Sequence, residues 1–395
     1  MKFSPTQAQA ALILNALSGV GPVACAKIYA AFDGDLAAAF SAPEKELARI
    51  SELGRAAVEK ILNWKRFFDL KKEEEKMAKS GVEFVPFFDA KFPKILLEIP
   101  NPPIGIYVRG NVAALQTRRA IGIVGTRKAS LYGTTQATKI GKELALSRWA
   151  VVSGLARGID TAAHVGTLEG NGVAIAVLGC GIDIVYPPEN AALYRRIIET
   201  GGAVVSEFPF GKVADKRSFP QRNRIIAGLG AGMLVVESDE RGGSMISAEF
   251  AADFGRTVFA LPGRVDQVNS RGCHRLIREG ATLITSADDI ISEMESVAIQ
   301  PSLALEFGSD NNAGAGRAES AHHQPETSAT TILATLPPEA ATIFKEFAGG
   351  DALSPDTISE RTNLPSGTIS SNLTLLEISR LLARRADGLY EKIFN

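Results

Sequence analysis

The chain has 395 residues, of which 43 are Lys or Arg and 44 are Asp or Glu, so its formal net charge is −1. This length predicts two or three domains, and the 45% of apolar residues are enough to build a sizeable core. No apolar run reaches the ~18 residues of a membrane span and no signal peptide is recognisable, which excludes an integral membrane protein and predicts a cytoplasmic one.

Residues 1–80 are predicted to form a small helical domain, with helical patterns at 6–17, 21–32, 36–39, 44–49 and 55–76. Between the first two patterns, Leu17-Ser-Gly-Val-Gly21 resembles a helix-hairpin-helix turn, in which backbone amides can meet a phosphate. Leu53-Gly54-Arg55 is a poorer second copy. Two-glycine turns also serve ordinary helix packing, so both DNA contact and packing remain open.

Residues 82–117 contain five prolines and are predicted to be an extended connector leading into the next domain. Within this segment, Tyr107 and Val108 are expected to add an edge strand to that domain. The connector is assigned to the same domain as the strands and helices that come after it in the chain, so the second domain is expected to cover residues 81–297.

Residues 118–294 alternate short apolar runs with helix-length segments. The runs, which are apolar on both faces as in strands buried beneath helices, are 120–124, 150–152, 173–178, 203–206, 233–237, 257–261 and 282–285. The helix-length segments between them include 133–148, 160–169, 189–200 and 244–254. Repeated βα units of this spacing predict an α/β domain with a parallel sheet and helices on both faces.

Glycine follows nearly every predicted strand, at Gly125, Gly154, Gly179, Gly243 and Gly263. The carboxyl ends of parallel strands form the edge where such sheets bind ligands, and the helix N-termini there favour anions. A single glycine is equally consistent with a simple turn, but five at one edge favour a phosphate-rich ligand. The dinucleotide fingerprint and the P-loop are both absent, so neither a bound dinucleotide nor ATP hydrolysis is predicted.

The C-terminal part is predicted to be a flexible linker, residues 298–331, followed by a winged-helix domain, residues 332–395. Three helical patterns, 338–347, 354–362 and 366–376, precede a two-stranded wing at 380–393 around Asp387-Gly388. The third helix of such a domain normally enters a DNA groove, but residues 366–378 contain no Lys or Arg. A protein-contact or regulatory role is therefore an equal alternative to DNA recognition.

The near-neutral total charge, which argues against a nucleic-acid partner, conceals an uneven distribution. Residues 118–157 carry eight basic residues against one acid, and residues 212–224 carry five against one. Residues 286–310 carry six acids and no base. The positive charge is therefore concentrated in the segments predicted to form the ligand edge.

Several arginines occupy that edge. Arg127 follows the first strand of the βα region, Arg157 follows the second, and the string Phe219-Pro-Gln-Arg-Asn-Arg224 follows the fourth. Arginine binds phosphate through two parallel hydrogen bonds, and an exposed aromatic ring such as Phe219 can stack on a base. The pattern predicts single-stranded nucleic acid as the ligand, with a solvated charged rim as the plain alternative.

Catalytic and metal-binding patterns are absent, so no catalytic residue, metal or cofactor is predicted. Asp160 is expected to cap the helix that it begins, with an acid as the alternative, and His164 is expected to be a structural residue of that helix, with a base as the alternative. Cys25, Cys180 and Cys273 lie far apart without a C-x-x-C pair, which excludes a disulfide scaffold and a zinc ribbon.

These loops resemble the DNA-processing protein A family, also called DprA or Smf, which comprises single-strand-binding recombination mediators of bacterial transformation. The resemblance is carried, in the family's order, by Ile123–Arg127, Ser153–Asp160, Ala163-His164, Ala176–Asp183, Tyr186-Pro187, Ser206-Glu207, Phe219–Ala227, Gly243-Ser244 and Leu261–Gly263. The sequence departs from the family's pattern at Gly242, where Ser is common, and at His274, where Asn is usual.

The resemblance implies a Rossmann-like core, a homodimer, binding of single-stranded DNA and its delivery to the recombinase RecA, without enzymatic activity. With the loop positions above, the predicted DNA contacts are Gly125, Thr126, Arg127, Gly154, Arg157, Phe219, Arg222, Asn223, Arg224, Gly243 and Ser244. Charge reversal at Arg127 or at Arg224 is accordingly expected to abolish DNA binding.

Two alternatives belong to other functional classes. A phosphoribohydrolase-type enzyme on a related sheet needs a Pro-Gly-Gly-x-Gly-Thr loop followed by Glu, whereas here Gly242-Gly243 follows Arg241 and Pro262-Gly263 precedes Arg264. A nucleotide sensor with a DNA-binding winged helix needs a basic third helix, which this sequence lacks.

Overall fold

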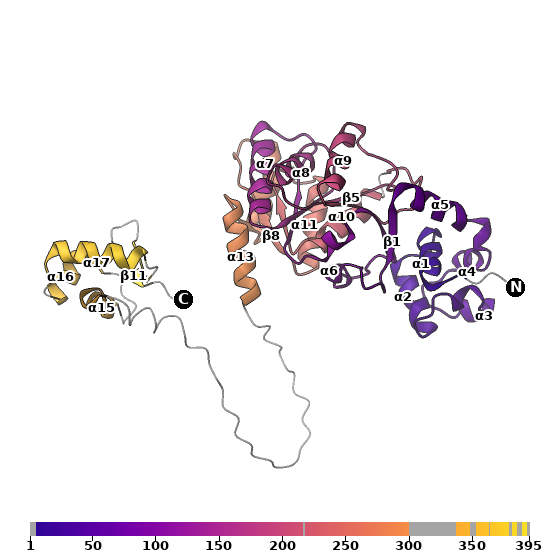
Figure 1. The fold of residues 1–395 in the computed structure, drawn as a ribbon, viewed down its shortest axis with the longest axis horizontal. Coiled ribbons are helices and arrows are strands. Elements are labelled where there is room, and N and C mark those ends of the chain that lie inside the picture. Colours follow the sequence, from indigo (N-terminus) through magenta and orange to yellow (C-terminus); the bar gives the residue numbers. More distant parts are fainter. Residues whose placement is uncertain are drawn as a thin grey trace, which may run out of the picture. The chain divides into compact units, whose positions relative to one another are not determined.

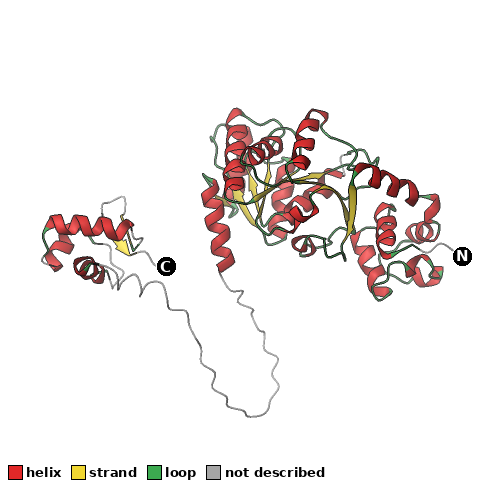
Figure 2. Ribbon diagram, in the orientation of Figure 1, coloured by secondary structure: helices red, strands yellow, loops and turns green. Residues whose placement is uncertain are grey.

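The computed structural model describes residues 5–215, 218–299, 337–347, 353–362, 364–378, 381–384 and 389–392. The chain divides into two compact units, Met1–Ala304 and Leu305–Asn395. The first unit contains a nine-stranded sheet covered by helices, with further helices near the N-terminus (Figure 1 and Figure 2). Within the described part of the chain, no helix is both long and apolar enough to cross a membrane.

The large sheet is mostly parallel. Its strands are β1 (Val82–Pro86), β2 (Gly105–Gly110), β3 (Ala120–Val124), β4 (Ala150–Ser153), β5 (Ala174–Leu178), β6 (Ala203–Ser206), β7 (Gly232–Val235), β8 (Thr257–Ala260) and β9 (Thr282–Leu283). They are arranged in the order β1-β2-β6-β5-β4-β3-β7-β8-β9, and every pair from β6 to β9 is parallel. The chain winds from β3 through β4 to β6 and then continues on the other side of β3 with β7. The crevice at this reversal is where open α/β sheets bind ligands.

Helices cover both faces of the sheet, as predicted. They are α7 (Leu131–Leu146), α8 (Ile159–Glu169), η4 (Pro188–Asn190), α9 (Ala191–Glu199), α10 (Ser218–Leu229), α11 (Gly243–Asp253), η5 (Val268–Ser270), α12 (Arg271–Arg278) and α13 (Ala287–Ile299). Ile121 and Ile123 of β3 pack into the core cluster formed with α7 and α8, whereas Ala120 and Val124 pack into the cluster formed with α10 and α11. The doubly wound, Rossmann-like α/β fold is therefore confirmed.

The predicted connector contains more structure than expected. Besides β1 and β2 it forms α6 (Lys94–Leu97) and η3 (Val112–Gln116). β2 pairs antiparallel with both β1 and β6. The strand that contains Tyr107 is therefore not at the edge of the sheet; β1 is the edge, and the sequence prediction missed it.

The N-terminal helices are α1 (Gln7–Ala16), α2 (Pro22–Ala31), η1 (Ala38–Phe40), α3 (Glu44–Leu47), α4 (Arg55–Leu62), η2 (Trp64–Arg66) and α5 (Leu70–Ser80). The single helix predicted for 55–76 is wrong, because Asp69 starts a new helix by accepting the backbone N–H of Lys72. The two glycine turns lie beside each other, since Lys60 of α4 hydrogen-bonds the hydroxyl of Ser18 and Lys27 of α2 hydrogen-bonds that of Ser51.

The helical domain shares a hydrophobic core with the sheet. Ile13 and Leu14 of α1 belong to the same buried cluster as Tyr107 of β2. The buried carboxylate of Glu73 on α5 accepts a hydrogen bond from the Tyr107 hydroxyl at 3.0 Å and from the backbone N–H of Phe210 at 2.9 Å. The boundary predicted near residue 80 therefore lies within one compact unit, between the helical domain and the sheet domain that share this core.

The second unit has the predicted elements of a winged helix: α15 (Pro338–Lys345), α16 (Pro355–Thr362), α17 (Ser366–Ile378), β10 (Leu382–Arg384) and β11 (Tyr390–Lys392). Ile343, Ile369 and Leu382 contribute to its buried core. The turn predicted at Asp387-Gly388 lies outside the described residues, as does the predicted linker apart from its first two residues, which end α13.

Candidate nucleic-acid interface

Two adjoining cavities lie at the carboxyl ends of β3, β4 and β7, where the sheet reverses direction. The larger encloses about 330 Å³, within the usual range of small-ligand pockets. Ten of the eleven predicted contact residues line one or both cavities: Gly125, Thr126, Arg127, Gly154, Arg157, Phe219, Arg222, Asn223, Gly243 and Ser244. Loops far apart in the sequence thus converge on one site.

The string from Phe219 to Arg224 forms the first turns of α10, not a loop as predicted. Successive residues of an α-helix are rotated by about 100°, so residues two apart point in nearly opposite directions. Arg222 accordingly faces the two cavities, and Arg224 faces another part of the molecule.

Arg222 lies at the floor of both cavities and is only 4% exposed. Its Nη1 atom donates a hydrogen bond to the carbonyl oxygen of Val177 at 2.9 Å. The guanidinium lies directly against Gly154, because a Cβ atom at that position would be 1.4 Å from Nη1. The glycine after β4 is therefore required to make room for this buried cation.

Asp160 is the buried carboxylate of the site. Its Oδ2 atom accepts the backbone N–H groups of Gly154 at 3.1 Å and Ala156 at 3.4 Å, so it orders the loop before α8. The expectation that Asp160 caps α8 is wrong, because Gly158 occupies the N-cap position. Burial raises the pKa of Asp160, and attraction from Arg222 opposes that shift.

The side chains that line the two cavities together carry slightly more positive than negative charge. Arg127 and Arg222 both interact electrostatically with the Asp160 carboxylate. Burial lowers the pKa of Arg222, attraction from Asp160 opposes this shift, and repulsion from Arg127 adds to it. Over both cavities, the guanidinium groups of Arg127, Arg157 and Arg222 face the carboxylates of Asp160 and Asp239, and this excess of one positive charge favours the entry of an anion.

Arg127 stacks on an aromatic ring. Its guanidinium carbon lies 4.7 Å from the centre of the Phe219 ring, in a cation–π arrangement. The ring also packs on the backbone of Gly179, where a Cβ atom would be 3.1 Å from Cδ1 of Phe219. Tyr186, whose ring centre is 6.0 Å from that of Phe219, is part of the same group and was not among the predicted contacts.

The N-termini of α7 and α11 both lie near the site. They differ in whether an acidic side chain already occupies the position where an anion would bind. At α7, which follows β3, the Glu237 carboxylate accepts hydrogen bonds from the backbone N–H and the hydroxyl of Ser130. In dinucleotide-binding proteins the pyrophosphate lies at the N-terminus of the helix that follows the first strand, which is the position that Glu237 occupies here. This agrees with the absence of the dinucleotide fingerprint from the sequence. At α11, by contrast, Gly242 supplies no side-chain cap, and Gly243 lines the larger cavity. The α11 N-terminus is therefore suited to a phosphate.

Arg157 lies at the outer rim of the smaller cavity. Its side chain is 51% exposed and forms an ion pair with Glu189, which also raises the pKa of Arg157. Because the pair is solvent-exposed, its contribution to stability is small, and the guanidinium can change partner when an anion arrives.

His164 lies fully buried beneath the site. Burial lowers the pKa of the imidazole to about 3, although an interaction with the backbone of Ser153 opposes this shift. The side chain is therefore neutral near neutral pH and inaccessible to a ligand, as expected for a structural residue.

The buried His164 predicts a dependence of stability on pH. In the unfolded chain its imidazole titrates near its ordinary value of about 6.5, whereas the folded chain stays unprotonated down to about 3. Between these values only the unfolded chain binds the proton, so stability falls as pH falls. From about pH 7 to about pH 5.5, urea unfolding is expected to show a loss about 1 kcal/mol larger in the native chain than in His164→Leu. Equal losses would contradict the assignment.

Cys180 lines the smaller cavity, but its surroundings do not activate it. Burial raises the pKa of the Cys180 thiol to about 11, so the nucleophilic thiolate is scarce at neutral pH. In the described part of the chain, no three His, Cys, Asp or Glu side chains are grouped so that they could hold a metal ion.

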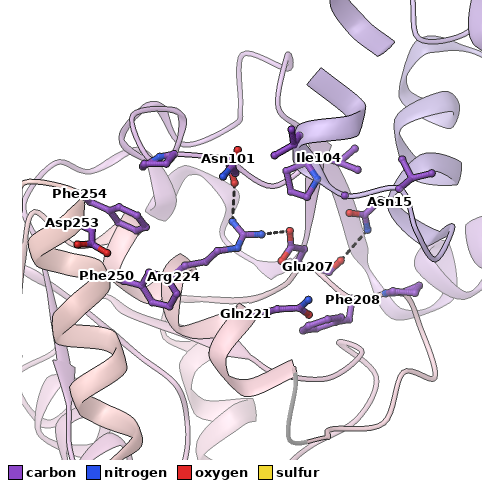
Figure 3. Close-up of a pocket in the computed structure, with 16 residues that line it drawn as sticks. Asn15, Asn101, Ile104, Glu207, Phe208, Gln221, Arg224, Phe250, Asp253 and Phe254 are labelled. Atoms are coloured by element: carbon purple, nitrogen blue, oxygen red, sulfur yellow. Dashed lines mark hydrogen bonds and ion pairs between the residues drawn. The ribbon is translucent and has the colours of Figure 1, made fainter. Parts of the chain in front are cut away.

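Arg224 lies in a separate cavity of about 520 Å³, between α10 and the N-terminal helices (Figure 3). Its side chain is 14% exposed, forms an ion pair with Glu207 and donates to the carbonyl oxygen of Asn101 at 3.1 Å. The Asn15 side chain of α1 donates to the Glu207 carbonyl oxygen at 2.9 Å. Arg224 thus belongs to the junction between the sheet and the helical domain and is not brought together with Arg127.

Comparison with known proteins agrees with this architecture. Residues 83–295 match the family model described as DNA recombination-mediator protein A, and residues 326–388 match the DprA winged helix domain. Protein Smf of Synechocystis sp. is 32% identical over 396 residues, covering 96% of this chain and 98% of its own length. The DNA processing protein DprA of Streptococcus pneumoniae is 40% identical over 232 residues, covering 58% of this chain and 80% of its own length.

Among solved structures, the X-ray structure of DNA processing protein A (DprA) from Streptococcus pneumoniae superimposes with a TM-score of 0.63 at 34% identity. The match covers 74% of this chain and 99% of the other. The two domain matches and the nearly full-length relative agree with the sequence motifs around the cavities. The chain therefore belongs to the DNA-processing protein A (DprA/Smf) family.

Proposed function

We propose that this protein binds single-stranded DNA in the two cavities at the sheet reversal and delivers it to RecA, as a recombination mediator in natural transformation. The observation that carries the proposal is the convergence of ten loop and helix residues, among them the exposed Arg127 and the buried Arg222, on these two cavities. Family membership, and the name of the family model, support the same process.

The chemistry of the site suits a nucleotide chain. Arg127 and the uncapped N-terminus of α11 can hold a phosphate, and the aromatic group that includes Phe219 offers ring surface for a base. A cavity of about 330 Å³ can take parts of a flexible single strand. A duplex keeps its bases stacked inside and cannot place them in such a cavity without unpairing. Single-stranded DNA is therefore the favoured ligand.

Binding is expected to weaken as salt concentration rises. Each phosphate neutralised on a single strand contributes about −0.7 to the slope of log affinity against log salt. Exchanging Arg157, the exposed cation of the rim, for Ala is expected to make the slope less steep by about that amount. Fluorescence anisotropy with labelled oligothymidine over a salt series measures both slopes. An unchanged slope would exclude Arg157 from phosphate contact.

The mediator role is tested separately from DNA binding. RecA-promoted strand exchange is measured on single-stranded DNA precoated with single-strand-binding protein, with and without the purified chain. The native chain is expected to accelerate the reaction, and Arg127→Glu is not. A native chain that binds the DNA without accelerating exchange would contradict the delivery to RecA and leave the DNA-binding proposal standing.

The proposal includes the absence of catalysis. The Asp160 carboxylate is occupied by backbone amides and the Cys180 thiol is deactivated by burial, so neither is poised to react. Incubation with nucleoside monophosphates is expected to release no free base, and release would revive the phosphoribohydrolase alternative.

The sensor alternative, with its DNA-binding winged helix, is disfavoured because α17 contains no Lys or Arg. A homodimer is also part of the proposal, and sedimentation equilibrium tests it directly.

A further inference from the structure

The ring of Phe219 has little free surface for a base. The Arg127 guanidinium lies over it at 4.7 Å, and the backbone of Gly179 lies against its Cδ1 and Cε1 atoms. The ring of Tyr186 follows at 6.0 Å with an interplanar angle of 46°. Phe219 is thus the middle member of a row of three side chains, between Arg127 on one side and Tyr186 on the other.

Tyr186 is the outer member of this row, and its side chain is accessible. It lies in the segment between β5 and η4, lines the smaller cavity and is 38% exposed. The smaller cavity encloses only about 10 Å³, so no base fits into it beside Phe219. A base that stacks here must therefore use the outer surface of Tyr186.

A cation lies next to this exposed ring. Arg157 lines the same cavity as Tyr186, and its guanidinium interacts with the Tyr186 hydroxyl as well as with Glu189. An aromatic face beside an exposed arginine supplies the two contacts of single-strand recognition, stacking for the base and charge for the phosphate. The phosphate position at Arg127 and the α11 N-terminus lies in the larger cavity, on the other side of Phe219.

We propose that Tyr186 is the platform on which a base of the bound strand stacks, and that with Arg157 it forms a second nucleotide subsite. Phe219 supports Tyr186 from within and aligns Arg127 with the larger cavity. This inference rests on the proposed binding of single-stranded DNA and adds to it the residue that recognises the base.

The test compares Tyr186→Ala and Tyr186→Phe with the native chain by fluorescence anisotropy, on oligothymidine and on an abasic strand of equal length. On oligothymidine, Tyr186→Ala is expected to weaken binding about five- to 160-fold, the usual effect of losing one stacked base. Tyr186→Phe retains the ring and is expected to restore binding to within about twofold of native. On the abasic strand, Tyr186→Ala and native are expected to bind equally.

Tyr132→Ala is the matched control, because Tyr132 is a similarly exposed tyrosine, 46% accessible, that lines a different cavity. It is expected to bind both strands as the native chain does. Native-like binding of oligothymidine by Tyr186→Ala would overturn the inference, and so would an equal loss on the abasic strand, which would indicate a structural role. A native chain that binds neither strand would overturn the proposed function itself, and the inference with it.

Discussion

Arg127→Glu is expected to lower the affinity for single-stranded DNA more than any other single exchange at the site. The change removes a phosphate-binding fork, breaks the stacking on Phe219 and places a negative charge beside Asp160. Arg127 is exposed, and a hydrogen bond to a charged group contributes about 1.5–3 kcal/mol, which corresponds to a loss of roughly 10-fold or more. Fluorescence anisotropy with oligothymidine at moderate salt measures the loss.

Lys128→Glu is the matched control for that experiment. It makes the same charge change one residue further along the chain, at an exposed side chain that lines neither of the two cavities. Only the general electrostatic field changes, so the expected loss is a few-fold and disappears at high salt. If both exchanges weakened binding equally at high salt, Arg127 would be part of a diffuse charged rim and not of a built site.

Arg224→Met is expected to affect folding stability, not DNA contact. The exchange leaves the Glu207 carboxylate buried without its cation, and breaking such a pair costs about 3–5 kcal/mol. It also removes the hydrogen bond to Asn101 at the junction with the helical domain. Urea unfolding, followed by circular dichroism, is expected to show this lower free energy of unfolding.

Two further variants make the assignment of Arg224 specific. Arg157→Met breaks an exposed ion pair and is expected to leave the free energy of unfolding essentially unchanged. Adding Glu207→Gln to Arg224→Met removes the unpaired charge and is expected to recover part of the lost stability. An Arg224→Met chain of native stability that no longer binds DNA would restore the contact role that the sequence suggested.

The parallel sheet could be predicted because its strands are buried on both faces and therefore appear as continuous apolar runs, such as residues 120–124. β1 could not, because its neighbouring prolines indicate a connector, and its pairing with β2 is decided by packing against the helical domain. The break between α4 and α5 was missed because the helical pattern of the sequence continues across it. The Asp69 side chain accepts a backbone N–H at the start of α5, and this local hydrogen bond begins a new helix.

The site was predictable to the extent that glycine and arginine follow strands at one edge of the sheet. Arg222 and Arg224 could not be separated, because their different roles follow from the α-helical conformation of this string, which the sequence suggested was a loop. Tyr186 lies in the matched string Tyr186-Pro187, but only the tertiary structure shows that its ring completes the row begun by Arg127 and Phe219.

The most direct test of the central claim is one salt titration of the native chain with a single strand, a duplex of the same sequence and a mononucleotide, each measured by fluorescence anisotropy or by competition. The single strand is expected to bind most tightly, with an affinity that falls steeply as salt rises, and the mononucleotide least tightly. Preference for the duplex, or an affinity for the single strand that does not change with salt, would contradict the claim.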